Sequence, residues 1–99
     1  MSNWANVISS NLRLILVRAL EQSPGYELNE SILHTVVTRF GHNVSRDVIK
    51  TELTWLKEQG LLTLEEVMGY YVATLTQRGI DVANGRSTVP GVDRPSPRS

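Results

Sequence analysis

The sequence predicts a single α+β domain that is mainly helical. Apolar residues recur at the three- and four-residue spacing of amphipathic helices in three segments before residue 60. After residue 61 the pattern changes to runs rich in β-branched, aromatic and aliphatic residues, which favour strands. The chain has 99 residues, of which 40% are hydrophobic and 20% charged, and this is typical of one small globular domain.

The first predicted helix covers residues 4–21 and is apolar on two faces. Drawn at about 100° per residue, one stripe carries Trp4, Ile8, Leu12, Ile15 and Ala19, widened by Leu16 and Leu20. This stripe is expected to face the core, and Trp4 either begins it or docks on a second subunit. The opposite side carries Val7, Leu14 and Val17. The helix ends at Pro24 and Gly25, because proline cannot continue the hydrogen-bond ladder and glycine supplies turn geometry.

Two further helices follow, joined by a short turn that contains glycine. The second runs from about residue 29 to 40, with Asn29 as its N-cap and Gly41 just after its end. The third helix, residues 45–59, is capped by Ser45 and ends at Gly60. The connection between them, residues 41–44, has the length of a helix-turn-helix turn.

A hairpin and a short helix complete the predicted domain. Residues 61–67 and 70–75 are expected to form two strands, with Met68 and Gly69 at the tip of the hairpin. The last helix is expected to begin at Thr76 and end near Gly85. Its interior Gly79 disfavours the helix by roughly 1 kcal/mol relative to alanine.

The C-terminal residues are predicted to form a tail. Residues 86–99 contain three prolines and three arginines but few apolar side chains, which is typical of an unpacked segment. The expected organisation is therefore one folded domain, residues 1–85, followed by a flexible tail, residues 86–99.

The predicted order of helix, helix, turn, helix and hairpin is that of a winged helix-turn-helix domain, in which the hairpin is the wing. The second helix of such a motif lies in the major groove of double-stranded DNA. Here that helix is residues 45–59, and its outward stripe of Arg46, Lys50 and Lys57 suits bases and phosphates. The expected DNA-binding residues are Ser45, Arg46, Lys50, Thr51, Thr54, Lys57 and His42, together with Arg94 and Arg98 of the tail. The alternative is a solvated helix face of mixed charge.

The charge balance favours a second hypothesis. The chain has 10 basic and 10 acidic residues, which excludes a strongly basic protein that coats nucleic acid. Glu65 and Glu66 lie on the hairpin, whereas a wing along phosphates is expected to be basic. The alternative function is therefore a non-enzymatic protein–protein interaction module that contacts its partner through the hairpin and the tail.

The second apolar face of the first helix predicts a homodimer. Val7, Leu14 and Val17 need cover, which the last helix supplies within one subunit or a second copy supplies across an interface. The dimer, made from these terminal helices, is the interpretation we favour. Its two-fold symmetry would also set two recognition helices about one DNA turn apart.

No residue pattern indicates catalysis or a bound cofactor. Glu65 and Glu66 are adjacent on a strand and point to opposite faces, so they cannot act as a paired acid and base. The chain has no cysteine, and neither His34 nor His42 has a ligand-spaced partner, so we expect no metal site. The protein is predicted not to be an enzyme.

Glu52 is the one acidic residue predicted to lie on the inward side of the third helix. A carboxylate buried without a partner costs several kcal/mol. We therefore expect an arginine, Arg13 or Arg39, or a capping amide to meet it.

Four segments resemble small winged-helix proteins encoded by Mu-like transposable phages and prophages, some of which are labelled ArsR-like transcriptional regulators. The segments are PGYELNESIL, FGHNVSRDVIKTELTWLKEQGLLT, VATLTQRGIDVANGR and VPGVDRPSPR, and together they cover nearly the whole chain. The resemblance implies a phage protein with a winged-helix fold. The metal-sensing cysteines of ArsR repressors have no counterpart here. No apolar run approaches the ~18–20 residues of a membrane span and no signal peptide is evident, so the expected location is the bacterial host cytoplasm, with no membrane partner.

Overall fold

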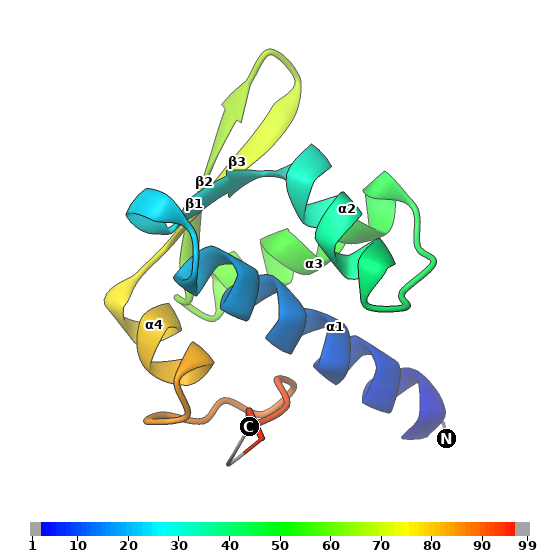
Figure 1. Cartoon of the computed structure of the whole chain (residues 1–99), viewed down its shortest axis with the longest axis vertical. Helices are drawn as coiled ribbons and strands as arrows, with labels where there is room; N and C mark the ends of the chain where they lie inside the picture. The colour runs from blue at the N-terminus through cyan, green and yellow to red at the C-terminus, as the bar shows by residue number, and fades with distance from the viewer. Residues whose placement is uncertain (1–2, 97–99) are drawn as a thin grey trace.

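The structure is a computed structural model that describes residues 3–96. Its helices are α1 (Asn3–Glu21), α2 (Glu30–Arg39), α3 (Arg46–Glu58) and α4 (Gln77–Ala83), and its strands are β1 (Glu27–Asn29), β2 (Leu62–Val67) and β3 (Tyr70–Leu75) (Figure 1). A single 3₁₀ turn, Pro24–Tyr26, leads from α1 into β1. The predicted α+β class, mainly helical, is confirmed, as are the three predicted long helices, the hairpin and the short helix after it.

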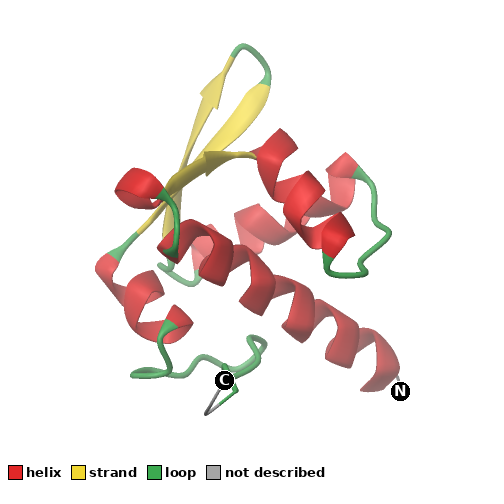
Figure 2. Cartoon of the chain, in the orientation of Figure 1, coloured by secondary structure: helices red, strands yellow, loops and turns green. Residues whose placement is uncertain are grey.

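The sheet contains a strand that the sequence did not predict. The three strands are antiparallel in the order β1-β3-β2, and β1 pairs Leu28 with Ala73 and Asn29 with Val72. Figure 2 shows the sheet at one end of the helices, with the β2–β3 hairpin extending beyond them. Alternation needs about four residues to be recognised, so the three residues of β1 leave no readable pattern. The pairing nevertheless fixes the start of α2 against β3.

The predicted N-caps Asn29 and Ser45 are confirmed, and Thr76, the predicted start of the last helix, is also an N-cap. The side-chain oxygens of Asn29, Ser45 and Thr76 accept hydrogen bonds from the backbone N–H of Ile32, Val48 and Gly79, respectively. Each cap satisfies an amide that the first helical turn leaves unpaired. These local bonds explain why the beginnings of α2, α3 and α4 were predictable to within a residue.

The predicted core stripe of α1 is only partly confirmed. Leu12, Leu16 and Leu20 of that stripe are buried at 0–2% exposure, whereas Trp4 is 73% and Ile8 40% exposed. Leu14 and Val17, which were predicted to lie on the other side, are also buried, at 8% and 0% exposure, so the buried face is rotated toward them. Contacts with α4 and the C-terminal segment cover the Leu14 side. Leu14 and Val17 are thus buried by this chain itself, which corrects their assignment to a dimer interface. Val7 is 53% exposed, and its place in an interface stays a prediction.

The C-terminal segment packs against the domain as far as the structure describes it, so the unpacked tail predicted for residues 86–99 is corrected for residues 86–96. Val89 and Val92 are only 5% and 8% exposed. They flank a tight turn in which Val92 N–H donates to Val89 O, with Pro90 and Gly91 at its centre and Gly91 at a φ of +97°. Proline followed by glycine at positive φ suits such a turn. The two buried valines anchor a segment whose composition had predicted an unpacked tail.

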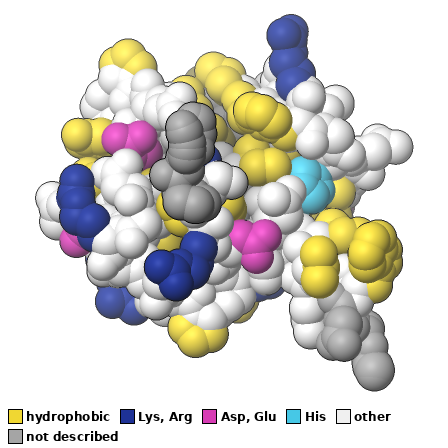
Figure 3. Space-filling model, turned by 60° about the horizontal axis from the view of Figure 1, so that its bottom comes forward, with side chains coloured by type: hydrophobic (Ala, Val, Ile, Leu, Met, Phe, Trp, Pro, Cys, Tyr) yellow, Lys and Arg dark blue, Asp and Glu magenta, His cyan; other side chains and the backbone are white. Residues whose placement is uncertain are grey.

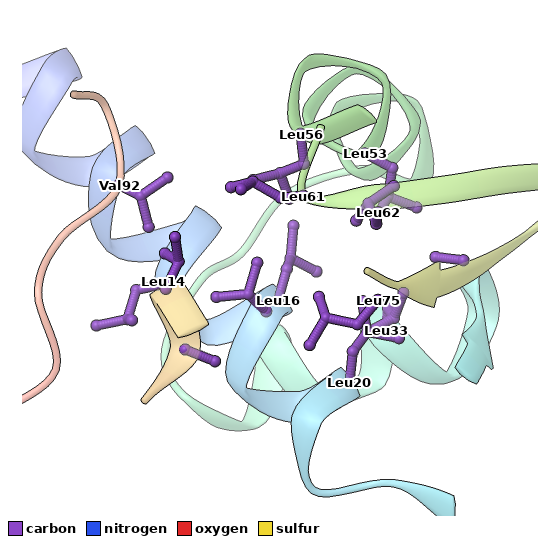
Figure 4. Close-up of a cluster of buried hydrophobic side chains, with 14 of the residues drawn as sticks. Leu14, Leu16, Leu20, Leu33, Leu53, Leu56, Leu61, Leu62, Leu75 and Val92 are labelled. Carbon is purple, nitrogen blue, oxygen red and sulfur yellow. The ribbon is translucent and has the colours of Figure 1, made fainter. Parts of the chain in front are cut away.

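The core lies where α1, α2, α3 and the sheet meet. Its most buried leucines come from α1, α2, α3 and the residue just before β2: Leu16, Leu20, Leu33, Leu53, Leu56 and Leu61 are all 0% exposed. Figure 4 shows the labelled leucines directed toward one another, with Leu14 and Val92 at the margin of the same cluster. This core fixes the position of α3 relative to the hairpin.

Candidate nucleic-acid interface

A buried carboxylate joins the start of α3 to the hairpin. The Glu30 side chain is 2% exposed, and its Oε1 accepts the backbone N–H of Tyr71 at 2.6 Å. Its Oε2 accepts from Nε and Nη2 of Arg46 at 3.3 and 3.2 Å. Lys50 Nζ lies 4.0 Å from Oε1. Because a buried charge is stable only when paired and hydrogen-bonded, Glu30 holds α2, α3 and β3 together.

Two tyrosines of the hairpin complete this cluster. The guanidinium carbon of Arg46 lies 4.9 Å from the centre of the Tyr70 ring, and Lys50 Nζ lies 5.5 Å from that of Tyr71. Both distances are within the range of cation–π attraction. The two cations that the sequence placed on an outward stripe therefore lie between α3 and the hairpin, with 38% of each side chain exposed.

Arg46 is oriented and still has hydrogen-bonding capacity. Its Nε and Nη2 point to Glu30, and its Nη1 has no hydrogen-bond partner among residues 3–96. A guanidinium carries five N–H donors in one plane, so the far edge of this one remains free for an acceptor. The position is the first residue of α3, the end of the helix that a helix-turn-helix protein directs at base edges.

The remaining predicted residues of α3 divide into two groups. The hydroxyls of Ser45 and Thr54 are used within the helix, since Ser45 caps it and Thr54 Oγ1 donates to Lys50 O at 2.9 Å. Thr51 and Lys57 are exposed. Two further exposed side chains of α3 are acidic, Asp47 and Glu58. The outer surface of this helix is thus mixed in charge, from Asp47 in its first turn to Lys57 and Glu58 in its last.

The other predicted DNA-binding residues lie away from this cluster. His42 Nε2 donates to Asn11 Oδ1 of α1 at 2.8 Å, so its ring faces α1. Arg94 lines a hollow with Arg18 and Asn84, beside α4 on the opposite side of the molecule from the hairpin tip (Figure 1). Arg98 lies outside the described residues. Among the predicted residues that the structure describes, Arg46 and Lys50 alone converge on one partner, Glu30.

Sequence reasoning missed Glu30 as a site residue. Glu30 directly follows the N-cap Asn29, a position where a carboxylate commonly interacts only with the helix dipole. The one available signal was the pair of cations at Arg46 and Lys50, four residues apart and so on one side of α3. Glu30 could be identified as their acidic partner only by knowing that β1 pairs with β3, because this pairing brings the start of α2 to the hairpin.

Comparison with known proteins identifies the family. Over 94 residues, which make up 95% of this chain and 97% of the relative, the chain is 48% identical to the uncharacterized protein gp26 of Escherichia phage Mu. The chain belongs to the gp26 family. Another family member, an uncharacterized protein of Haemophilus influenzae, is 44% identical over 77 residues, 77% of this chain and 74% of that protein. No family model and no solved structure matches the chain.

The gp26 relationship confirms the predicted resemblance to Mu-like phage proteins. It extends over the C-terminal segment, because the alignment to the Mu protein spans 94 of the 99 residues. Within residues 3–96 no helix is both long and apolar enough to cross a membrane.

A second ion pair in this gp26-family chain lies beneath the C-terminal segment. Arg13 Nε donates to Glu52 Oε1 at 2.6 Å, which confirms one of the two arginines predicted to meet Glu52. Arg13 Nη1 donates to Gly91 O at 3.0 Å, and the guanidinium lies 3.9 Å from the centre of the Trp55 ring. Nε and Nη1 of Arg13 donate within the chain, its face lies on Trp55 and its side chain is only 17% exposed, against 38% for Arg46. This pair is therefore structural.

Proposed function

We propose that this gp26-family chain is a winged helix-turn-helix protein that binds double-stranded DNA of a Mu-like phage in the bacterial cytoplasm and regulates transcription. In this proposal α2 and α3 are the helix-turn-helix, α3 enters the major groove and the β2–β3 hairpin is the wing. The order of elements and the short connection between α2 and α3 support this reading.

The observation that carries the proposal is the orientation of Arg46. A long side chain loses about 2 kcal/mol of rotamer freedom when it is fixed, and Glu30 and Tyr70 have already fixed this one in the free protein. Its unpaired edge suits the O6 and N7 acceptors of guanine or a phosphate. Lys50 adds a second partly exposed cation one turn further along α3.

Lys57→Glu and Arg39→Glu together test the proposal. Both residues are exposed cations in the last turn of a helix, α3 and α2 respectively, so their charge and helix-dipole effects match. The measurement is fluorescence anisotropy with duplex fragments of the phage genome, at about 50 and about 200 mM salt. We expect Lys57→Glu to weaken binding roughly tenfold and to reduce the salt dependence, while Arg39→Glu changes little.

Two results would contradict DNA reading by α3. One is a folded wild-type protein that binds no fragment at low salt. The other is an equal loss in the two variants, which would indicate only a general effect of net charge.

A second candidate function, a protein–protein interaction module, is favoured by the hairpin tip. Met68 is 96% exposed and has a φ of +53°, next to Gly69 at +84°. Such a turn prefers asparagine followed by glycine, so methionine there brings backbone strain without any packing in the described chain. Glu65 and Glu66 are exposed beside it. A flexible apolar side chain beside carboxylates fits a protein surface better than phosphates.

Glu66→Lys separates the two functions. If the hairpin lies along DNA, the added cation strengthens DNA binding, because one more counterion is displaced. If the hairpin contacts a protein, DNA binding is unchanged and co-purification of a phage or host protein with the wild-type chain is lost in the variant.

A further inference from the structure

The exposed side of α1 carries an apolar stripe that nothing covers within residues 3–96. Trp4 is 73%, Val7 53% and Ile8 40% exposed. Their spacing of three and four residues sets them side by side on the first two turns of the helix. Figure 1 shows these turns extending beyond α2, and in Figure 3 hydrophobic side chains gather at this N-terminal end of α1, at the right of the view.

Further along the same helix, α1 and α2 enclose an apolar groove. It has a volume of about 410 Å³ and is lined by Ile15, Ala19, Leu28, Ile32, Val36 and Phe40, with Arg18 at its rim. Phe40 is 68% and Ile32 47% exposed. An open groove lined by large apolar side chains is a typical binding site for an amphipathic helix.

The stripe and the groove belong to one continuous face. At about 100° per residue, Ile15 and Gln22 of the groove lie within about 20° of Trp4 around the α1 axis. The two halves are separated only by Asn11, which is exposed and hydrogen-bonds His42 at the end of α2. The N-terminal half of α1 thus projects, and the C-terminal half is recessed beside α2.

We propose that a second copy of this chain covers this face, with the two α1 helices antiparallel across a two-fold axis near Asn11. The projecting turns of each copy then lie in the groove of the other, so that Ile8 packs against Ile15 of the partner subunit. Self-complementary surfaces of this kind are what a two-fold interface requires. The inference goes beyond DNA binding and does not depend on it.

The charge of the groove and the apolar area available for burial are both consistent with a second copy of this chain. Arg18 is the ionisable side chain of the groove, and antiparallel order sets it opposite the ring of Trp4 of the partner subunit, a favourable cation–π arrangement. A fully buried aromatic side chain covers about 150–250 Å², so Trp4, Phe40 and the exposed aliphatic side chains offer on the order of 500 Å² per copy. Two copies then reach the ~1,000 Å² that a specific interface needs.

Sedimentation velocity over a range of concentrations tests the proposal. We expect the wild-type chain to be a dimer at micromolar concentrations. Ile8→Glu and Phe40→Glu are each expected to raise the dimer dissociation constant on the order of 30-fold or more, because each buries a carboxylate in an apolar contact. Met68→Glu is the control, since Met68 is exposed and apolar but lies at the hairpin tip. Circular dichroism verifies that each variant is folded.

A cysteine at the axis tests the geometry. The chain has no native cysteine, so Asn11→Cys is expected to form an inter-subunit disulfide under mild oxidation, whereas Met68→Cys is not. A wild-type monomer overturns the proposal. So does a dimer that Ile8→Glu leaves intact. A dimer lost in Met68→Glu instead would show that the acidic hairpin tip occupies the groove.

Discussion

Glu30 and Gly79 show how single residues acquire their roles from distant parts of the chain. Glu30 accepts a hydrogen bond from Tyr71, 41 positions away in the sequence. Gly79 lies inside α4, where the sequence indicated only a weak helix former. The structure instead puts it against Leu61 O, with which a Cβ at this position would clash. Both residues are required by contacts that no local pattern reveals.

Removing the Glu30 carboxylate is expected to destabilise the fold. Glu30→Ala should lower the free energy of unfolding by about 3 kcal/mol, because Tyr71 N–H loses its acceptor and Arg46 its partner. Glu30→Gln keeps an acceptor oxygen and should lose less. Urea unfolding of the two variants measures the difference. Equal losses would indicate that side-chain volume, rather than hydrogen bonding, is what Glu30 contributes.

Gly79→Ala should destabilise the protein although alanine is the better helix former. The added Cβ would meet Leu61 O and the Leu75 side chain, and Leu61 O is already the acceptor of Thr76 N–H at the start of α4. We expect a loss of about 2 kcal/mol or more in thermal or urea unfolding. The comparison is Gly60→Ala, which adds strain at a φ of +78° but meets only Arg78 Cδ at 3.8 Å. A stabilised Gly79→Ala variant would contradict the tight contact.

At the scale of elements, the C-terminal segment is part of the domain rather than an appendage. It follows α4, turns at Pro90 and Gly91 and returns across α1, where Asp93 N–H donates to Ser10 O. A Cβ on Gly91 would come within 2.8 Å of the Trp55 ring, so the backbone itself lies on the tryptophan. The segment thereby closes the side of the core that α4 leaves open.

Val92→Asp and Thr88→Asp distinguish this packed segment from a flexible one. Val92 is 8% exposed, whereas Thr88 is exposed four residues earlier in the same segment. Placing a carboxylate among the core residues at position 92 should lower the free energy of unfolding by about 3 kcal/mol. The change at position 88 should have an effect within about 0.5 kcal/mol. Equal small effects in thermal unfolding would favour the flexible tail.

At the scale of the whole molecule, four of the ten basic side chains form ion pairs within residues 3–96. Arg13 pairs with Glu52, Arg46 and Lys50 pair with Glu30, and Arg86 pairs with Asp81. On α3 a DNA-binding surface would combine the partly engaged Arg46 and Lys50 with the exposed Lys57. The proposed dimer would compensate for this, because two copies present each cation twice along one duplex.

The sequence by itself predicted the α+β class, the starts of α2, α3 and α4, the hairpin and an arginine for Glu52. These features depend on contacts within about four residues, such as caps, turns and helical periodicity, or on the cost of an unpaired buried charge. Arg46 and Lys50 were found for the same reason, since their spacing on one helix is local. Their shared partner, Glu30, could not be predicted in this way, because it lies on another helix.

Only the tertiary structure decided which side of α1 is buried, whether residues 86–96 pack and what joins α3 to the hairpin. Helix α1 is apolar on both sides, so its rotation depends on which elements cover it, and α4 and the C-terminal segment cover Leu14 and Val17. The bond from Arg13 to Gly91 joins residues 78 positions apart. Periodicity shows that a face is apolar but not which partner covers it, because that depends on the assembled core and, in the dimer proposed for the exposed stripe at Trp4, on a second molecule.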